Sequence, residues 1–473
     1  MKILLISTYE LGRQPFGLAS PAAWLRNAGM SVACHDLSRE QLREDEVREA
    51  DLIAFYVPMH TATRLAIEAL PVIRRSNPSA HLCFYGLYAP VNEDYLRRLG
   101  AQTILGGEFE EGLLRTAQQL RARRFCSASS QFEIENPGTG RNAPTFSQSE
   151  PVISHVRLRF QVPDRTGMPP LARYAHLEHP DGKPRVVGYT EASRGCKHLC
   201  RHCPVVPVYQ GRFRIIQPEI VLADIRQQVE VGAQHITFGD PDFFNGIRHA
   251  LRVVMALHQE FPALTYDVTI KVEHLLKHAE HLQTLRDTGC LFVTTAVESL
   301  DDRTLALLEK GHTRVDFLRV VELFQQTGLT LSPTFVAFTP WTTLGTYCEL
   351  LEAIAELDLV EQVAPIQLGI RLLIPAGSRL LELAEVRKLV GAFDEAGLVY
   401  PWRHSDLRVD ELYEQVQRVI QDGLKHRESR RAIFSQVREV AFKMAGHFAA
   451  PLPELPLLVS RASIPYLTEP WYC

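Results

Sequence analysis

The chain has no long apolar segment, although it contains 473 residues and 46% of them are hydrophobic. No stretch of about 18 consecutive apolar residues occurs, so we expect no transmembrane helix. The amino-terminal sequence MKILLIST lacks the long apolar core and small-residue cleavage site of a secretory signal. These absences argue against a membrane or secreted protein, and we expect a cytoplasmic location.

The chain also has no large excess of positive or negative charge. The formal net charge is −4 and the isoelectric point is near 6.5. A chain that binds a polyanion usually carries a clear excess of Lys and Arg, so we expect neither nucleic acid nor a membrane surface as a partner. The length predicts two or three domains with ample core.

The cysteines do not form a disulfide framework, because they are odd in number and most are scattered. Nine occur in the chain, and six of them stand far apart, at Cys34, Cys83, Cys126, Cys290, Cys348 and Cys473. The other three fall within eight residues of the segment GCKHLCRHCP, which runs from Gly195 to Pro204. In a reducing compartment such a tight group indicates metal binding or redox chemistry.

Residues 1–125 alternate short apolar runs with helical patterns. Strands are predicted at residues 2–7, 30–37, 50–58, 81–86 and 102–107, with helices between them. This alternation is typical of a parallel sheet covered on both faces, here a small doubly wound domain. Residues 126–150 are rich in Ser, Asn, Gly and Pro, and we expect a linker over 126–185.

A second α/β region is predicted over residues 186–400. Strands are expected at residues 186–192, 235–240, 265–273, 291–299, 332–338 and 366–374, and a helix begins near Pro218 and ends at Gly232. Six βα units indicate a partial (β/α)6 barrel, whose chemistry lies at the carboxyl ends of its strands. Residues 401–473 are predicted to be helical, with a Pro-rich tail.

The three clustered cysteines, Cys196, Cys200 and Cys203, follow the first strand of this second region directly. Structural zinc sites close with four ligands, and His198 or His202 could supply the fourth. Iron–sulfur clusters also take Cys thiolates, usually four. Three thiolates would leave one iron of a [4Fe–4S] cluster open to a substrate, which is the interpretation that we favour over zinc.

The CxxxCxxC spacing, its position after the first strand and several later motifs resemble the radical SAM superfamily. This resemblance implies a [4Fe–4S] cluster held by Cys196, Cys200 and Cys203, whose open iron binds S-adenosylmethionine. It also implies that the backbone at Gly239, Asp240 and Pro241 receives the methionine amino group, although the usual Gly-Gly-Glu is replaced here.

Further positions resemble the superfamily one at a time. The segment TTAVESLDDRTLALLEKGHT is similar to the superfamily segment in which the counterparts of Glu298 and Ser299 face the ribose and the methionine carboxylate. Lys271 and Glu273 end the third predicted strand, and Arg371 lies on the sixth. Lys271 and Arg371 are cofactor-binding candidates, with ordinary ion pairs as the alternative. His202 either stacks near the adenine or donates a hydrogen bond toward the cluster.

The first domain resembles the cobalamin-binding domains that precede many radical SAM domains, through GGEFEE at Gly106–Glu111. The Asp-x-His-x-x-Gly motif that supplies an axial histidine is absent, and His35 and His60 do not match it. We therefore expect either no cobalamin or cobalamin without a histidine ligand from the protein. A vestigial or interaction domain is the alternative.

The carboxyl-terminal sequence LTEPWYC resembles a radical SAM group whose tails read Cys-Sec-Ala-Glu-Pro or Cys-Cys-Ala-Glu-Pro. That resemblance implies a selenoprotein truncated at Cys473, with Cys473 as a catalytic residue that presents the acceptor. It points further to arsinothricin biosynthesis, in which a 3-amino-3-carboxypropyl group is transferred to trivalent arsenic. Soft thiolate or selenolate ligands suit such a thiophilic centre.

Three functions therefore stand open. The first is aminocarboxypropyl transfer to arsenic, the second is cobalamin-dependent methyl transfer, and the third is a cluster-bearing sensor or binding protein without turnover. The first two require a small-molecule acceptor, arsenite in the first, and an electron donor of the reductase or flavodoxin type.

Overall fold

The computed structural model describes residues 1–129, 152–448 and 464–469. They fall into two compact units, Met1–Glu10 with Pro15–Pro169 and Leu11–Gln14 with Pro170–Cys473. Residues 126–185, where we expected a linker, contribute the end of a helix and two short strands that extend the sheets of the two units.

The first unit is built on a parallel sheet whose strands lie in the order β2-β1-β3-β4-β5-β6. All five strands expected here form, and a short sixth joins β5. Their bounds are β1 Lys2–Ser7, β2 Ser31–Asp36, β3 Leu52–Tyr56, β4 His81–Tyr85, β5 Thr103–Gly107 and β6 Ile153–Ser154. The order 2-1-3-4-5 is that of a doubly wound, flavodoxin-like sheet, as the sequence predicted.

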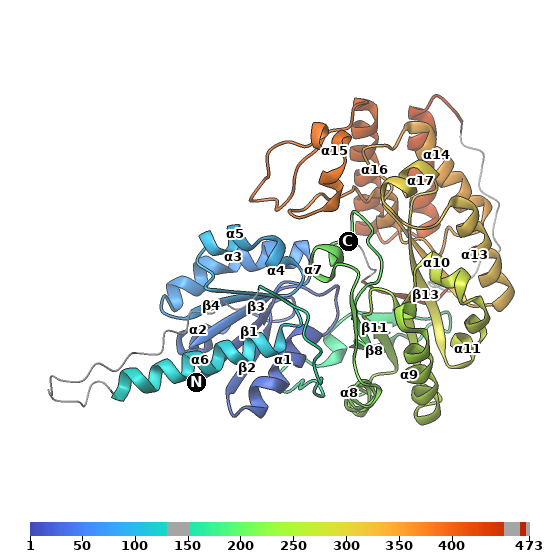
Figure 1. Ribbon diagram of the computed structural model, residues 1–473. Helices are drawn as coiled ribbons and strands as arrows, with labels where there is room; N and C mark the ends of the chain where they lie inside the picture. Colours follow the sequence, from blue (N-terminus) through green and yellow to red (C-terminus); the bar gives the residue numbers. More distant parts are fainter. Residues whose placement is uncertain (130–151, 449–463, 470–473) are drawn as a thin grey trace. The chain divides into compact units, whose positions relative to one another are not determined.

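Helices cover both faces of this sheet (Figure 1). They are α1 Phe16–Asn27, α2 Glu44–Glu49, α3 His60–Ser76, α4 Tyr88–Val91, α5 Glu93–Arg98 and α6 Glu110–Ser129. Side chains of α1 and α6 pack with alternate residues of β1, such as Ile3 and Leu5. Leu4 and Ile6 pack on the opposite face against α2, α3 and α5. Burial on both faces explains why β1 is a continuous apolar run.

The second unit is built on a curled half-barrel sheet with the strand order β14-β13-β12-β11-β8-β7-β15. The strands from β8 to β14 are parallel, and β7 and β15 add to the β8 edge in antiparallel fashion. Their bounds are β7 His176–Glu178, β8 Arg185–Thr190, β11 His235–Phe238, β12 Thr265–Thr269, β13 Cys290–Glu298, β14 Thr330–Phe335 and β15 Tyr466–Leu467.

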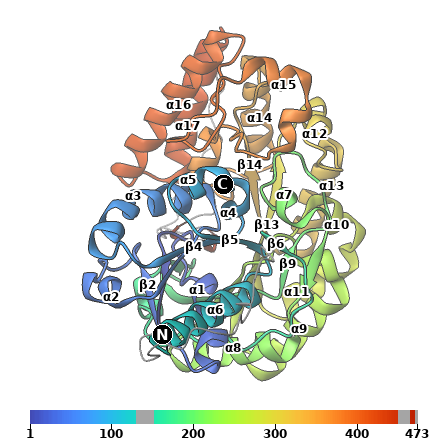
Figure 2. The ribbon, with the colours of Figure 1, turned by 60° about the vertical axis from the view of Figure 1, so that its left-hand side comes forward.

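The helices of the half-barrel alternate with its strands, as the βα pattern predicted (Figure 2). They are α8 Pro218–Glu230, α9 Ile247–Glu260, α10 Val272–Lys277, α11 Leu282–Asp287, α12 Asp302–Leu307, α13 Arg314–Thr327 and α14 Leu344–Glu356. Short 3₁₀ turns are η1 Leu171–Arg173, η2 Phe243–Gly246, η3 Ala279–His281, η4 Pro365–Gly369 and η5 Arg379–Glu382. The carboxyl-terminal extension holds α15 Ala384–Leu389, α16 Leu407–Lys425 and α17 Arg430–Met444.

The sixth strand expected at residues 366–374 does not form as a regular strand. Residues Pro365–Gly369 make the η4 turn, and Arg371 contributes a single parallel bridge to Phe338. Side chains occupy the carbonyl groups that a neighbouring strand would use, because Tyr347 donates to the Leu368 carbonyl and Gln417 to that of Gly369. Among the helices in the described part of the chain, none is both long and apolar enough to span a bilayer.

Candidate active site

The loop with three cysteines begins at the carboxyl end of β8 and is closed by a two-stranded ribbon. Strand β9 (Ser193–Gly195) pairs with β10 (Phe213–Ile215) in antiparallel fashion, and the helix α7 (Val205–Tyr209) lies between them in the sequence. Gly195 has a φ of +73°, and a Cβ there would meet the Arg212 carbonyl oxygen at 2.4 Å. Only glycine fits this position, so the ribbon fixes where the loop starts.

The three thiols of the loop lie near one another and are shielded from water. Cys200 is buried, while Cys196 and Cys203 are partly buried. Burial raises the pKa of the Cys203 thiol to about 12, and the neighbouring Cys200 and Cys196 raise it further. Burial and then Asp242 raise the pKa of Cys196. Three thiols close together, with the pKa values of Cys196 and Cys203 raised, fit a site whose thiolates are stabilised by a bound cationic metal centre.

Residues after β11 hold the start of the loop. The Asn245 side-chain oxygen accepts a hydrogen bond from the Lys197 backbone N–H at 3.2 Å and lies 3.9 Å from the Cys196 sulfur. The Asp240 carboxyl accepts from the Ala192 N–H at 2.9 Å and from the Ser193 hydroxyl at 2.5 Å. Burial raises the pKa of Asp240 to about 7. The side chain of Asp240 is therefore used to join β11 to the loop.

A group of charged and imidazole side chains, buried except for Glu273, surrounds His198, which lies between the first two cysteines in the sequence. The Lys271 ammonium lies 3.0 Å from His198 Nδ1 and 3.3 Å from the Glu273 carboxylate. Asp242 lies 2.7 Å from His274 Nδ1 and 3.6 Å from His198 Nε2. Burial would raise the pKa of Asp242, but the two imidazoles lower it to about 2.

This group also contains three possible metal ligands. One ligand atom each of Cys196, His198 and Asp242 lie within 4.8 Å of one another. A zinc ion could use such a set, which keeps the zinc interpretation of the cysteine loop open. Asp242 already interacts with His274 and accepts a hydrogen bond from the Phe244 N–H. This set of ligands is therefore less available to a metal ion than the three thiols are.

A second buried network lies on the other side of the loop, at the end of β13. Glu298 has a φ of +69°, at a register shift between β13 and β14. Its carboxylate lies 3.0 Å from His202 Nε2 and 3.1 Å from the Lys310 ammonium. Burial would raise the pKa of Glu298, but Lys310 and His202 hold it well below its usual range.

Lys310 connects this network to the thiols. Burial would lower the pKa of its ammonium, but Glu298 and the sulfur atoms of Cys200 and Cys203 raise it. The ammonium stays charged inside the protein because its neighbours are anionic or become so on ionisation. A buried cation facing two thiols fits a site that carries negative charge once a cluster is bound.

The structure brings most of the predicted site residues together around this loop. His202 and Glu298 contact each other, Lys271 contacts His198, and Gly239, Asp240 and Pro241 follow β11 beside the loop. Ser299 follows Glu298, and its hydroxyl accepts from the Asp301 N–H. Glu298 and Ser299 line a small pocket with residues that follow β14, among them Val336 and Ala337.

Two predicted residues are not part of this group. Arg371 pairs with Asp410 at 2.8 Å, donates to the Trp402 carbonyl and stacks on the Trp402 ring at 3.8 Å. Its described partners thus belong to the carboxyl-terminal extension, and its cofactor role stays a prediction. Cys473 lies outside the described residues.

Sequence reasoning missed Lys310, Asp242, His274 and Asn245. Asp242 and Asn245 follow a predicted strand closely, which is a usable signal for parallel sheets. Lys310 lies twelve residues after Glu298 in the sequence, on the far side of helix α12. No rule of sequence spacing predicts that two residues placed in this way are in contact.

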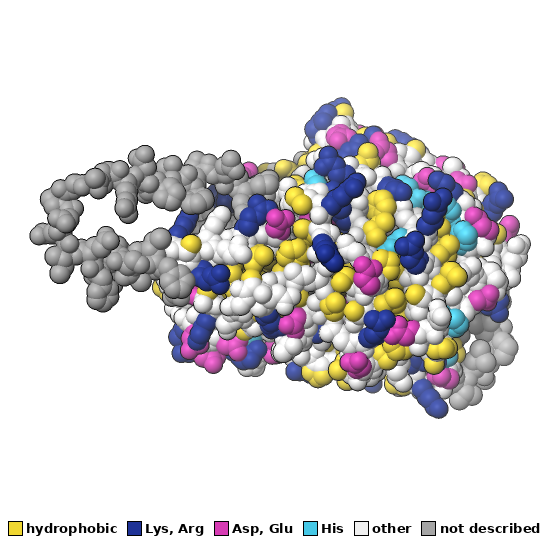
Figure 3. Space-filling view, turned by 60° about the horizontal axis from the view of Figure 1, so that its bottom comes forward, with side chains coloured by type: hydrophobic (Ala, Val, Ile, Leu, Met, Phe, Trp, Pro, Cys, Tyr) yellow, Lys and Arg dark blue, Asp and Glu magenta, His cyan; other side chains and the backbone are white. Residues whose placement is uncertain are grey.

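On the face shown in Figure 3, the described Lys and Arg side chains lie among Asp, Glu and apolar side chains. No field of one sign spans that face.

Comparisons with known proteins agree with this geometry. Residues 190–344 match the sequence profile of the Radical SAM superfamily. Hopanoid C-3 methylase from Methylococcus capsulatus is 23% identical over 350 residues, covering 72% of this chain and 64% of the methylase. A tRNA-2-methylthio-N(6)-dimethylallyladenosine synthase from Desulfitobacterium hafniense is 42% identical over 55 residues, 12% of each chain. The chain thus spans less than two thirds of the length of either relative.

Two solved structures share the fold. The cobalamin-dependent S-adenosylmethionine radical enzyme OxsB, with aqua-cobalamin and S-adenosylmethionine bound, superposes with a TM-score of 0.68 at 15% identity, covering 89% of this chain and 67% of OxsB. The radical S-adenosylmethionine methyltransferase TsrM from Kitasatospora setae gives a TM-score of 0.59 at 18% identity, covering 81% of this chain and 76% of TsrM.

Proposed function

We propose that this chain, whose residues 190–344 match the Radical SAM superfamily profile, is a cobalamin-dependent radical SAM methyltransferase. The observation that carries the proposal is the pairing, in one chain, of a doubly wound 2-1-3-4-5 sheet with a half-barrel that bears three clustered thiols. The cobalamin-dependent enzyme OxsB matches 89% of the chain across that pairing. The most extensive of the curated matches named above is a methylase.

The cluster and S-adenosylmethionine fit the half-barrel. Cys196, Cys200 and Cys203 would hold a [4Fe–4S] cluster, and the backbone at Gly239–Pro241 with Glu298 and Ser299 would hold S-adenosylmethionine. When bound, the cluster supplies one electron that breaks a carbon–sulfur bond of S-adenosylmethionine. The electron would come from a donor of the reductase or flavodoxin type.

The chain's own residues have three tasks in this proposal. Asn245 and Asp240 fix the loop and keep the thiols in one orientation. Lys310, paired with Glu298, offsets the negative charge of the thiolates inside the protein. Burial of the loop excludes water, which protects a reactive carbon centre from side reactions.

Cobalamin would be held by the first unit, at the carboxyl edge of its sheet. His35 and His60, the two histidines considered from the sequence, both interact with other side chains of the first unit. His35 is buried with its Nε2 2.8 Å from Glu46, and burial lowers its pKa. The His60 ring packs edge-on against Tyr88 at 6.4 Å. We therefore propose cobalamin without a histidine ligand from this chain.

Transfer of an aminocarboxypropyl group to arsenite, with a selenocysteine after Cys473, stays a prediction from the tail motif. The names of the relatives given above mention neither arsenic nor selenium. The methyltransferase interpretation has the stronger support.

Product analysis tests the proposal. The anaerobically reconstituted protein is incubated with S-adenosylmethionine, dithionite and hydroxocobalamin, and the nucleoside products are identified. We expect S-adenosylhomocysteine that depends on cobalamin, together with 5′-deoxyadenosine. Methylthioadenosine would instead support the aminocarboxypropyl transfer, and no cleavage at all would support a sensor or binding protein.

Two variants control this assay. Cys200→Ser removes a thiol of the loop and should abolish all products. Cys348→Ser changes a buried free cysteine on α14 and should leave them unchanged. Equal loss in both variants would indicate general damage rather than a missing cluster ligand.

A further inference from the structure

The middle of the cysteine loop is tied to a segment far away in the sequence. The Leu199 carbonyl accepts a hydrogen bond from the Arg379 guanidinium at 2.6 Å. The Arg201 carbonyl accepts one from the Ser378 hydroxyl at 3.4 Å. Arg379 begins the turn η5, and Ser378 directly precedes it. Both acceptors are backbone carbonyl groups, so these bonds do not depend on what the thiols bind.

Arg201 also connects the loop to the end of helix α12. Its backbone N–H donates to the Leu308 carbonyl at 3.0 Å, and its guanidinium donates to the Leu307 carbonyl at 2.8 Å. The last carbonyl groups of a helix have no partner within the helix. Arg201 lies between Cys200 and Cys203 in the sequence, so it caps α12 and holds this part of the loop against the helix end.

One carboxylate, that of Glu309, joins the two arginines. It lies 2.6 Å from Arg201 Nη2 and 2.9 Å from Arg379 Nη1. Arg379 also bonds to both carboxylate oxygens of Glu382, at 3.0 and 3.1 Å. Glu309 has a φ of +54°, a conformation that residues other than glycine keep only where their surroundings hold it. The backbone turn at Glu309 is therefore fixed by its contacts with the two arginines and their neighbours.

The turn after α12 connects the loop to two other parts of the unit. Leu308 packs with Leu380 of η5 in the apolar core of the carboxyl-terminal extension. Lys310 reaches the buried Glu298 carboxylate at the end of β13. The cysteine loop, the extension and the Glu298 network are therefore held together at this one turn.

We propose that Arg201 and Arg379 are positioning residues, which hold the cysteine loop so that Cys200 and Cys203 keep one orientation toward a cluster. Hydrogen bonds from charged donors are stronger than those between neutral groups, and a guanidinium paired with both oxygens of a carboxylate has a fixed geometry. For its purpose this inference rests on the proposed radical SAM function, in which the open iron would keep one position relative to Glu298.

Release of iron tests the proposal in the full-length, reconstituted protein. The protein is mixed anaerobically with an excess of an iron chelator, bathophenanthroline disulfonate, and loss of the cluster is followed by its visible absorption. We expect Arg201→Gln and Arg379→Gln to release iron at least about tenfold faster, the factor that corresponds to one lost hydrogen bond from a charged donor. Arg379→Lys should give an intermediate rate, since it keeps the charge but loses the paired bonds to Glu382.

Amide hydrogen exchange tests the same contacts in the cluster-free, full-length chain. The Arg201 amide should be protected in the wild type because it donates to the Leu308 carbonyl. Arg379→Gln should increase exchange of the peptide that contains residues 196–203 about tenfold, and peptides of the first unit should exchange as in the wild type. This measurement needs neither a cluster nor methyl transfer, so it tests the role of the arginines separately from the proposed function.

A matched variant and a stability measurement control both experiments. Arg408→Gln removes an exposed arginine of α16 that pairs with Asp406, and it should change neither iron release nor exchange of the loop. The side chains of Arg201 and Arg379 are 20% and 27% exposed. Ion pairs with such exposure add little to global stability, so the Tm of the cluster-free Gln variants should stay within about 4 °C of the wild-type value.

Two results would overturn the proposal. Wild-type rates of iron release and loop exchange in both Gln variants would show that other contacts hold the loop. A larger fall in Tm, with faster exchange throughout the half-barrel, would mean that the arginines stabilise the whole unit instead of positioning the loop. If the wild type assembles no cluster while faster exchange in Arg379→Gln is confined to the loop, the arginines do hold the loop and only the proposed function fails.

Discussion

The carboxyl edges of the two parallel sheets carry different side chains. In the first unit, aromatic rings fill the edge at the ends of β3, β4 and β5, where Tyr56, Tyr85 and Phe109 lie 5.0–6.0 Å apart. The Tyr85 hydroxyl donates to the Gly17 carbonyl at 2.8 Å. These contacts are ordinary core packing. Three carboxylates, Glu10, Glu108 and Glu110, are also buried at this edge.

In the second unit, the same kind of edge carries thiols and buried charges. Glu298, Lys310 and Asp242 are each nearly enclosed by protein, with side-chain exposures of 9%, 4% and 2%. Charges at such depth are expensive to bury unless their neighbours compensate them. The comparison indicates that the βα architecture permits chemistry at both edges, whereas the three clustered thiols identify the half-barrel edge as the one that can hold a metal cluster.

The largest effect that we predict is on the cluster. Cys200→Ser should reduce iron to well below one cluster per chain and abolish cleavage of S-adenosylmethionine, because two thiolates cannot hold the cluster. Iron and sulfide analysis with the visible absorption spectrum measures this. Cys34→Ser, in a buried position of the first unit, should retain both the cluster and the activity. If Cys200→Ser kept a full iron complement, Cys200 would not be a cluster ligand, and the thiols would no longer distinguish the half-barrel edge from the edge of the first unit.

The next effect concerns the buried pair at the end of β13. Lys310→Met should lower the free energy of unfolding by about 3–5 kcal/mol, because it leaves the Glu298 carboxylate buried without its ammonium partner. Urea unfolding of the protein measures this change. The double variant Lys310→Met with Glu298→Gln should recover most of the loss. Equal losses in the single and double variants would mean that packing of the Lys310 side chain, rather than its charge, is what matters.

A smaller effect should appear in the pH dependence of stability. Burial raises the pKa of Asp240 from 3.8 to about 7, so between these values the folded protein holds a proton that the unfolded chain releases. Stability should therefore fall as the pH rises from about 4 to about 7, by about 2–4 kcal/mol.

Asp240→Asn should remove this fall. Unfolding titrations at pH 4.5, 6 and 8 compare the two proteins, with Asp394→Asn at an exposed position as the control. An unchanged slope in Asp240→Asn would mean that the carboxyl is ionised when buried, held by Ser193 and the Ala192 N–H.

The smallest effect is expected in the first unit. If cobalamin binds, His60→Ala should leave its absorption spectrum unchanged, because the His60 ring packs against Tyr88 instead of a ligand. Difference spectra of the wild type and the variant with hydroxocobalamin measure this. A spectral shift on substitution would show that His60 ligates the cobalt, so that the first edge would also carry a metal ligand.

The sequence predicted the strands well and the side-chain partners poorly. Apolar runs such as KILLIS and HITFGD mark β1 and β11 because strands buried on both faces must be continuously apolar. The spacing of Cys196, Cys200 and Cys203 predicted a metal site directly. In contrast, residues 366–374 are equally apolar but do not form the predicted strand, because the side chains of Tyr347 and Gln417 donate hydrogen bonds to the carbonyl groups of Leu368 and Gly369.

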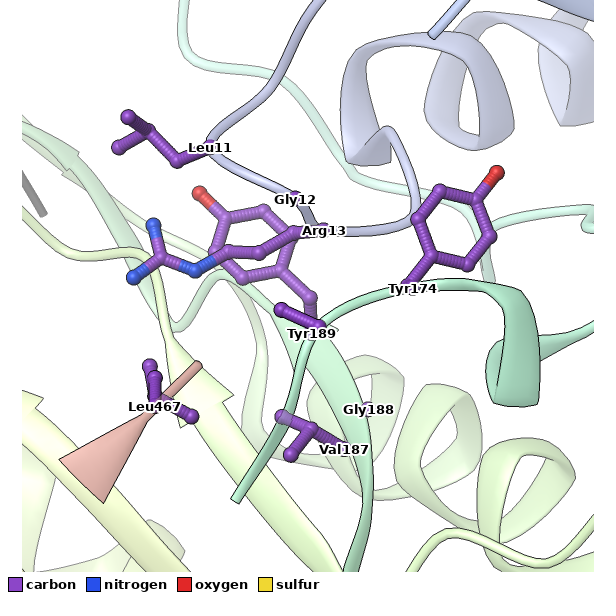
Figure 4. A pocket seen from close by; sticks show the side chains of 9 residues that line it. Leu11, Gly12, Arg13, Tyr174, Val187, Gly188, Tyr189 and Leu467 are labelled. Atoms are coloured by element: carbon purple, nitrogen blue, oxygen red, sulfur yellow. The ribbon is translucent and has the colours of Figure 1, made fainter. Parts of the chain in front are cut away.

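The candidate site shows the same limit. Glu298 was predicted as a site residue, but its pairing with Lys310 depends on a positive φ and a register shift at the end of β13. The guanidinium carbon of Arg13 lies 5.2 Å from the centre of the Tyr189 ring (Figure 4), a contact between residues far apart in the sequence. Such contacts arise from tertiary structure, so they cannot be predicted from the local periodicity of apolar residues.

The most direct test of the account asks whether the three thiols leave one iron open. The reconstituted protein is reduced with dithionite, and its electron paramagnetic resonance spectrum is recorded with and without S-adenosylmethionine. We predict a [4Fe–4S]⁺ signal whose g values change when S-adenosylmethionine is added, since a three-cysteine cluster has a free coordination site. A protein that binds zinc in place of iron, or a reduced cluster whose signal does not respond to S-adenosylmethionine, would contradict the account.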